Sequence, residues 1–434
     1  MAPSRLTRRH MLHAGAGLLL ASHRSRAAGS YRVGVGVDAG GNGYAAALRA
    51  IGFSASWNAL PLSGRVAVVK PNLVTSATPD SGAVTDPEVA RAVVDLCLLG
   101  GARAVFIVEN SRGGALFNAA GYSATFSAYP ASRVALVDQA LLPHVMAPVP
   151  GGYNYGAIRV PEFLTSPDVI LINVAKLKTH AEAGVTLAAK NGFGYPEANS
   201  YINTELPAGR FAMHDRGVHY SIADLNLLRS PDFHLVDGVW GMEGLGPTRG
   251  TPVRMNAVFA GANALAVDRA AAAAMQVPDQ SIRHFVILAG KGLGPSSLSE
   301  VEIAGDSLTP RAFVMPPLPP VLDRPYLTAA QFNPSRGERV VIIQGYYGIV
   351  HRKAEIVALR DDASAVRLVR TLLPFAYRGP GADVISWDGR DDAGAIVPPA
   401  QPPERYAVHF RAYGLNPDNN RPADSINWIT VANA

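Results

Sequence analysis

Cysteine is almost absent from this 434-residue sequence, and Cys97 is the only one. A lone cysteine cannot form an intrachain disulfide or supply the four thiolates that hold an iron–sulfur cluster. Cys97 lies in an apolar helical pattern that ends at Gly100 and Gly101, so we expect a buried, unreactive thiol. No Cys-ligated iron–sulfur cofactor is expected.

Charged residues are also scarce, at 17% of the sequence, and they balance beyond the N-terminus. The formal net charge is +5, and the first 27 residues hold five arginines and no acid: Arg5, Arg8, Arg9, Arg24 and Arg26. These five charges account for the whole excess, so the remainder is formally neutral. No net positive field remains to attract nucleic acid or an anionic membrane.

Long apolar runs are absent as well. The N-terminus holds the segment that most resembles such a run. The apolar stretch 11–21 is shorter than the about 20 residues that a membrane-spanning helix needs. It follows Thr7-Arg8-Arg9-His10-Met11-Leu12, which resembles the twin-arginine export pattern, and Ser25-Arg26-Ala27 suits cleavage. We expect a twin-arginine signal peptide at residues 1–28, a periplasmic or extracellular location, and no transmembrane segment in the mature chain.

From residue 29 to residue 308 the sequence alternates between strand-like and helix-like segments. This alternation predicts an α/β domain with a mostly parallel or mixed sheet. Asp86 followed by Pro87 and Glu88 marks the start of a helix. The expected strands are 65–69, 104–108, 134–137, 169–174, 233–236 and 257–261, and further helices are expected at 221–228 and 264–275.

The pattern changes after this domain. Residues 309–331 are rich in proline and are expected to form a semi-rigid linker. Residues 332–434 then carry short strand candidates separated by turns, at 339–344, 355–359, 366–371, 384–387 and 406–412. That spacing predicts a small all-β sandwich.

Polar residues recur just beyond the expected strands of the α/β domain. The carboxyl ends of strands are where open α/β sheets bind ligands. The residues that would meet there are Lys70, Asn72, Glu109, Lys176, Lys178, His180, Asp237 and Glu243.

The densest group follows the apolar run 169–174. Lys176, Lys178 and His180 alternate, so on an extended strand they point to the same side, and Lys190 with Asn191 lies ten residues on. Three basic groups on one side repel each other unless an anion, an acid or a metal lies among them. The group is therefore a solvated cationic patch, a carboxylate or phosphate site, or a catalytic lysine that acts as a base or forms a Schiff base.

Two further ligand sites remain open at this stage. Zinc, iron or manganese would suit a mixed imidazole and carboxylate site, for which the candidates are His180, His214, His219 and Asp224, with Asp237 or Glu243. The loop that holds Gly244 and Gly246 is either an ordinary turn or a phosphate cradle made of backbone amides. It matches neither a Walker nor a Rossmann pattern, and no HExxH or GxSxG motif is present.

Residues from about 65 to 295 resemble the bacterial and archaeal family described as domain of unknown function 362. The resemblance rests on ordered matches at 68–74, 85–87, 101–102, Glu109, 168–194, 222–226, 236–238, 242–247, Gly250 and 266–268. It implies an α/β domain but no reaction, because the family's biochemistry is largely unassigned. Some relatives carry ferredoxin-like cysteine motifs, which this sequence lacks.

Residues 332–413 resemble the immunoglobulin-like module of flagellar hook-capping proteins. The matching residues are 332–335, 369–372, 387–392, Gly394 and 397–398. The resemblance implies a role in spacing or attachment, with contacts to the cell envelope or to other proteins.

Together these features predict an exported enzyme that acts on a small anionic metabolite, with the reaction unresolved. The expected catalytic residues are Lys178, His180, Lys190, Glu109, Asp237 and Glu243, and the expected ligand- or cofactor-binding residues are Lys70, Asn72, Lys176, Asn191, Gly244 and Gly246. The cofactor is not identified, and a divalent metal is one candidate. The alternatives are a non-catalytic binding protein for an anion or a metal chelate, and a structural envelope protein.

Overall fold

The computed structural model describes residues 31–203, 210–215, 217–316, 321–322, 326–347, 350–360, 366–378, 381–401, 404–414 and 422–432. The expected signal peptide lies outside the described residues, as do residues 317–320 and 323–325 of the expected linker. The chain divides into two compact units. The first comprises residues up to Val145, 160–197 and 229–316, and the second comprises 146–159, 198–228 and 317–434.

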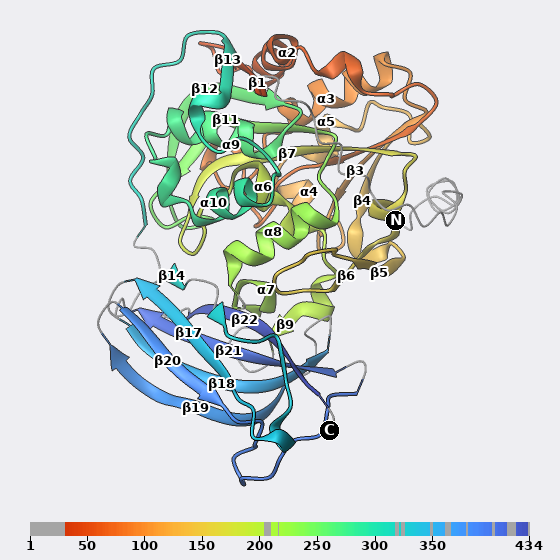
Figure 1. The fold of residues 1–434 in the computed structure, drawn as a ribbon. Helices are drawn as coiled ribbons and strands as arrows, with labels where there is room; N and C mark the ends of the chain where they lie inside the picture. Colours follow the sequence, from red (N-terminus) through yellow and green to blue (C-terminus); the bar gives the residue numbers. More distant parts are fainter. Residues whose placement is uncertain are drawn as a thin grey trace. The chain divides into compact units, whose positions relative to one another are not determined.

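The first unit is built on a nine-stranded mixed sheet (Figure 1). Its order is β13-β1-β12-β11-β7-β2-β3-β4, and β8 pairs with β7. The bounds are β1 (Tyr31–Val37), β2 (Val66–Lys70), β3 (Ala104–Glu109), β4 (Val134–Asp138), β7 (Val169–His180), β8 (Gly184–Val185), β11 (Phe233–Glu243), β12 (Thr251–Gly261) and β13 (Val301–Gly305). Five neighbours, β11 to β4 in that order, run parallel, and β12 runs antiparallel to both β11 and β1.

The mixed α/β architecture is as expected from the sequence, but three strands are much longer than their apolar runs. Strand β12 begins at Thr251 rather than at Ala257. Strand β7 continues from the run 169–174 through all of the basic residues to His180, and its whole length is buried. Strand β11 continues from 233–236 to Glu243. Strand β13, at one edge of the sheet, and its neighbour β1 were not expected.

Helices cover both faces of this sheet. On one face lie α2 (Gly43–Ser54) and α3 (Pro87–Leu99), and on the other lie α6 (Leu187–Asn191) and α9 (Ala264–Ala274) (Figure 1). The remaining helices of this unit are α4 (Ala115–Ala119), α5 (Tyr122–Thr125) and α10 (Arg283–Gly290). Because both faces are covered, the central strands are apolar nearly throughout rather than alternating.

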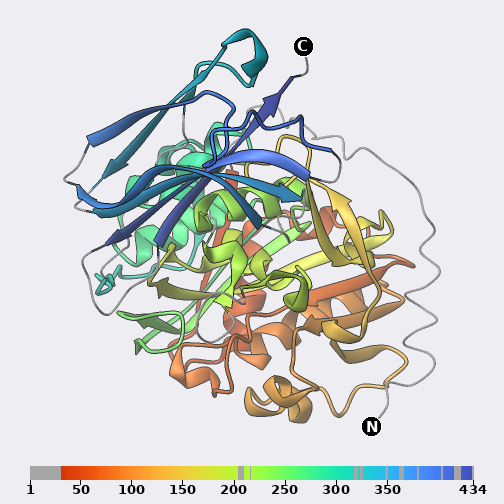
Figure 2. The same ribbon diagram turned by 90° about the horizontal axis from the view of Figure 1, so that it is seen from below.

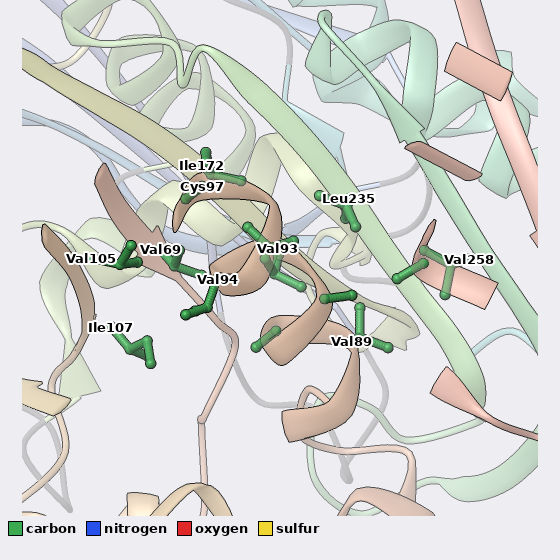
Figure 3. Packing of buried hydrophobic residues seen from close by; sticks show 14 of the residues in the cluster. Val69, Val89, Val93, Val94, Cys97, Val105, Ile107, Ile172, Leu235 and Val258 are labelled. Atoms are coloured by element: carbon green, nitrogen blue, oxygen red, sulfur yellow. The ribbon is translucent and has the colours of Figure 1, made fainter. Parts of the chain in front are cut away.

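Helix α3 shows how the sequence sets this packing. The Asp86 side chain accepts the backbone N–H of Glu88 at 2.8 Å, and Pro87 occupies the first helical position. The helix then places Val93 and Cys97 against strand residues such as Val69 and Ile172 (Figure 3). Burial of the Cys97 thiol raises its pKa and makes it unreactive, as expected.

The second unit contains two larger β-sheets, drawn in blue in Figure 2, besides the pair β9 and β10. One has the order β14-β17-β15 with β20 paired to β17, and the other has the order β16-β22-β21-β18-β19. The bounds are β14 (Val321–Leu322), β15 (Tyr326–Leu327), β16 (Gln331–Phe332), β17 (Val340–Tyr347), β18 (Val350–Arg360), β19 (Val366–Arg378), β20 (Gly381–Trp387), β21 (Glu404–Gly414) and β22 (Pro422–Val431). Residues of both sheets, including Ile342, Trp387 and Val408, share one hydrophobic cluster.

The second unit also holds segments that lie earlier in the sequence. These carry β9 (Ile202–Asn203), β10 (Arg210–Phe211), α7 (Ala212–Asp215) and α8 (Val218–Leu228), while β5 (His144–Pro148) and β6 (Ala157–Pro161) lie where the chain passes between the units. The expected linker contributes β14 and β15, which pair with β17. No helix in the described part of the chain is long and apolar enough to cross a membrane.

Truncating a core side chain of β7 tests this packing. Ile172 is fully buried, whereas Ile303 of β13, in the same sheet, is 50% exposed. We expect Ile172→Ala to lower the free energy of unfolding by about 2–5 kcal/mol, because it removes apolar contacts and leaves a cavity. Ile303→Ala should change it by less than about 0.5 kcal/mol. Scanning calorimetry of both variants gives the comparison, and equal shifts would contradict the assignment of the core.

Candidate functional site

The candidate site lies at the carboxyl edge of the parallel strands. Strand β2 lies between β3 and β7. Helix α3 connects β2 to β3, and β7 is the next strand of this sheet after β4 along the chain. The connections therefore leave in opposite directions on the two sides of β2. In open α/β sheets such a switch point opens a ligand crevice beyond the strand ends.

Four lysines gather at this edge, and we call Lys70, Lys176, Lys178 and Lys190 the lysine cluster. All four are buried, and Lys176 and Lys178 are fully so. Lysine rarely occupies such positions without partners. The whole sequence contains only six lysines against 33 arginines, so two thirds of its lysines are in this cluster.

Lys70, at the end of β2, forms an ion pair with Glu109, at the end of β3. Its Nζ lies 2.7 Å from Oε2 of Glu109 and also donates to the carbonyl of Pro71. The same carboxylate accepts the backbone N–H groups of Leu73 and Asn110. Glu109 therefore neutralises Lys70 and also fixes the loops that follow both strands.

Lys176 forms the second ion pair, with Asp237 of β11. Its Nζ lies 2.7 Å from Oδ2, in the register that pairs the two residues across β7 and β11. Asp237 also accepts the backbone N–H of Val239, where β11 bulges, and that of Asp86. Burial and the neighbouring charge of Asp237 raise the pKa of Asp86 to about 6. The start of α3 is thereby tied to the sheet edge.

Lys178 is held differently from these two lysines. Its Nζ donates to the carbonyls of Ala83, at 2.6 Å, and Pro247, at 3.3 Å. Within the described ranges no carboxylate forms an ion pair with it. Burial lowers its pKa well below the usual range for lysine, and the nearby charges of Lys190 and Lys176 lower it further. This environment favours the neutral amine.

Lys190 is carried by the short helix α6. Burial lowers its pKa to about 7, and its Nζ lies 4.5 Å from the ring centroid of Phe193. Asp268, on α9, accepts the backbone N–H groups of Ala188 (2.6 Å) and Ala189 (2.9 Å) in this helix. Burial raises the pKa of Asp268 to about 7. The position of Lys190 thus depends on a buried carboxyl group.

Three asparagines connect the elements around the cluster. Asn173 donates to the carbonyl of Ala188 at 2.9 Å, and its side-chain oxygen accepts from Asn191 at 2.7 Å. Asn191 in turn accepts from Asn72 at 2.8 Å. Because Asn173 and Asn191 each have the side-chain nitrogen and oxygen engaged with different groups, the chain of bonds fixes the orientation of these two amides. Asn72 and Asn191 therefore meet, as expected, and Asn173 joins them.

The other expected site residues, His180, Glu243, Gly244 and Gly246, form hydrogen bonds outside the lysine cluster. His180 follows the cluster on β7, and its Nδ1 accepts the backbone N–H groups of Glu182 and Ala183. Glu243 accepts the N–H of Val314. The Gly244 and Gly246 amides donate to Val314 and Gly244 carbonyls respectively, rather than facing outward together. A side chain at Gly246 would collide with the carbonyl of Thr179, which explains the glycine.

The metal candidates do not form one group. His214, His219 and Asp224 belong to the second unit, whereas His180 belongs to the first. Both oxygens of Asp224 accept backbone N–H groups, from residues 153–155. Among the residues that the structure describes, no three His, Cys, Asp or Glu side chains are placed to hold a metal ion.

Sequence reasoning overlooked Asp86 and Asp268 as parts of the site, and it took no account of Asn173. Asp86 was read only as a helix cap, Asn173 is buried in an apolar run, and Asp268 lies in an alanine-rich helix. The sequence signal that could have located this site is the distribution of lysine along the chain. A sequence that otherwise prefers arginine places lysine at all four of these positions.

The comparisons with known proteins cover this edge of the sheet. Residues 67–273 match the model of the family described as Domain of unknown function (DUF362). This part of the chain is a DUF362 domain. It includes the whole lysine cluster, its two carboxylate partners and Asp268.

Thylakoid-associated protein sll1697 of Synechocystis sp. (strain ATCC 27184 / PCC 6803 / Kazusa) is 26% identical over 230 residues, which cover 53% of this chain and 69% of that protein. Two solved structures match at a TM-score of 0.16. Dimeric latent PorU from Porphyromonas gingivalis is 13% identical, and the match covers 48% of this chain and 20% of the PorU chain. The β-glucosidase EmGH1 from Erythrobacter marinus is 12% identical, and the match covers 92% of this chain and 49% of the EmGH1 chain. Similarity at this level carries no argument about fold or function.

The buried carboxyl group of Asp268 makes stability depend on pH. Its pKa in the folded protein, about 7, lies above the usual 3.8. Between these values the folded protein holds a proton that the unfolded chain has released, so raising the pH favours unfolding. We expect the wild type to lose stability relative to Asp268→Asn as the pH rises from about 4 to about 7. Urea unfolding of both proteins across this range measures the difference. A difference that stays constant with pH would contradict the prediction.

Proposed function

We propose that the DUF362 domain is an enzyme domain that binds a small anionic metabolite, a carboxylate or a phosphate, at the lysine cluster. The observation that carries the proposal is Lys178. Its amine is buried among three other lysines, and no described carboxylate pairs with it. An anion beside this group would stabilise its protonated form, as the charge of nearby Glu109 does in part.

Electrostatics support an anion in preference to a neutral ligand. Burying like charges together is unfavourable, and the cost falls when an opposite charge is buried with them. Glu109 and Asp237 already balance Lys70 and Lys176. Lys178 and Lys190 are the two lysines whose pKa is lowered, so they are the groups that gain most from an added anion.

The choice of lysine supports an enzyme. Arginine holds carboxylates and phosphates through two parallel hydrogen bonds, but it keeps its proton at any pH that proteins meet. Lysine gives up its proton when it is buried beside other cations, and it can then act as a base or a nucleophile. A site that only retained an anion would not need the residue that this sequence otherwise uses so sparingly.

One observation favours the alternative, a non-catalytic binding protein for an anion or a metal chelate. Glu109 and Asp237 were expected to assist in catalysis, yet each is engaged by a lysine and by two backbone N–H groups. Neither is poised to accept a proton from a substrate. In the enzyme that we propose, proton transfer would therefore fall to the lysine amines or to His180.

We also propose that the protein is exported by the twin-arginine route and that residues 332–434 are an immunoglobulin-like module for attachment to the envelope or to other proteins. The export proposal is supported by the Thr7-Arg8-Arg9-His10-Met11-Leu12 pattern and the apolar stretch after it. The module is supported by two β-sheets that share one core around Trp387.

Binding of simple anions tests the proposed function. We expect inorganic phosphate or lactate to bind to the wild type and to bind more weakly above about pH 7, because Lys190 then becomes neutral. Lys178→Met should weaken binding about tenfold or more, because an anion beside Lys178 favours the ammonium form of its amine and Met can carry no charge. Isothermal titration calorimetry at several pH values provides the measurement.

Lys291→Met is the matched control, since Lys291 belongs to the same unit but lies beyond α10 and outside the cluster. It should bind the same anions as the wild type does. If neither anion binds to the wild type, or if Lys178→Met binds them equally well, the proposed function is wrong.

A further inference from the structure

The four lysines of the cluster are held in different ways. Lys70 and Lys176 each lie 2.7 Å from a carboxylate, an arrangement that uses the ammonium group as a charge. Lys190 lies over the face of the Phe193 ring, and aromatic faces attract cations. Lys178 is held by two carbonyl oxygens.

The contacts of Lys178 suit a neutral amine. A neutral amine has two hydrogens and one lone pair, and the carbonyls of Ala83 and Pro247 accept two hydrogens. An ammonium group would have a third hydrogen to place among lysines that repel it. The remaining lone pair makes Lys178 the nucleophile of the cluster, and burial together with the charges of the other lysines favours this unprotonated form.

We propose that Lys178 forms an imine with an α-oxo carboxylate. This inference rests on the proposed function, and it names the substrate class. The Nζ atom attacks the carbonyl carbon, and one of its two hydrogens passes as a proton to the carbonyl oxygen to give a carbinolamine. The hydroxyl group takes one further proton from solvent and leaves as water, which gives a protonated imine with a single N–H. The substrate carboxylate supplies the anion, which the charges of the neighbouring lysines hold, with Lys190 as the candidate because Lys70 and Lys176 already pair with carboxylates.

The geometry around Lys178 also indicates how substrate would reach it. Lys178 is fully buried, and Pro247 belongs to the segment 244–250, in which Leu245 is exposed. Because Lys178 is fully buried, a neighbouring segment must move for a substrate to enter, and the segment 244–250 contacts the amine directly through Pro247. A protonated imine keeps a single N–H. That hydrogen suits the shorter contact with Ala83, and the longer contact with Pro247 is then released.

Reductive trapping tests the inference on the full-length protein. The protein is incubated with pyruvate, sodium borohydride is added, and the mass of the intact protein and of its peptides is measured. Borohydride reduces the imine to a stable secondary amine, so we expect one adduct, on the peptide that contains Lys178. Lactate, which has the carboxylate but no carbonyl, should give none.

Variants assign the adduct to one amine. Lys178→Arg keeps a positive charge but cannot form the imine, so the adduct should be lost, whereas Lys291→Arg should retain it. Because arginine fits poorly where lysine is fully buried, the melting temperature of Lys178→Arg is compared with that of the wild type. Peptide mapping of the wild type locates the adduct even if that variant fails to fold.

The outcomes separate this inference from the proposed function. If the wild type binds lactate or phosphate but pyruvate leaves no adduct after borohydride, the imine is wrong and the anion site stands. An adduct on another lysine also overturns the assignment to Lys178. If none of the three anions binds and no adduct forms, both proposals fail.

Discussion

Moving an ammonium group out of water costs several kcal/mol unless charges and hydrogen bonds replace the lost hydration. This chain places four lysines at one sheet edge, and two buried carboxylates satisfy that requirement for Lys70 and Lys176. Glu109 and Asp237 each pair with a lysine and each also accept two backbone N–H groups. The carboxylates that neutralise the lysines therefore also fix the loops after β2 and β3 and the start of α3.

The sheet topology explains why these groups meet. Parallel strands bring their carboxyl ends to one edge, and a long β7 carries Lys176 and Lys178 beyond the last paired residue of β2. Asp237 pairs with Lys176 across β11 and β7, and directly after it β11 bulges, where the Asp237 side chain accepts the N–H of Val239. Bulges of this kind often redirect side chains next to functional sites.

The sequence was informative where one local pattern decides the structure. Apolar runs located the central strands, and Asp86-Pro87 located the start of α3. The end of β7 was hidden because lysine and histidine are typical of strand ends, whereas here partners in distant segments make their burial acceptable. The pair Lys176–Asp237 spans 61 residues, and only strand register brings it together. Asn173 and Asp268 were hidden for a similar reason, because their partners are backbone and amide groups that no local pattern specifies.

The same electrostatics that keep Lys178 neutral set a condition on any substrate. An anion that settled directly on Lys178 would favour its ammonium form and so remove the nucleophile. A substrate must therefore place its charge on a neighbouring amine and a neutral, electrophilic carbon on Lys178. An α-oxo carboxylate has this layout, because its carbonyl carbon is bonded directly to the carboxylate. Lys190, whose pKa of about 7 rises when an anion approaches, is suited to take the charge. The division of roles among the lysines thus favours a substrate that carries both groups over a simple anion.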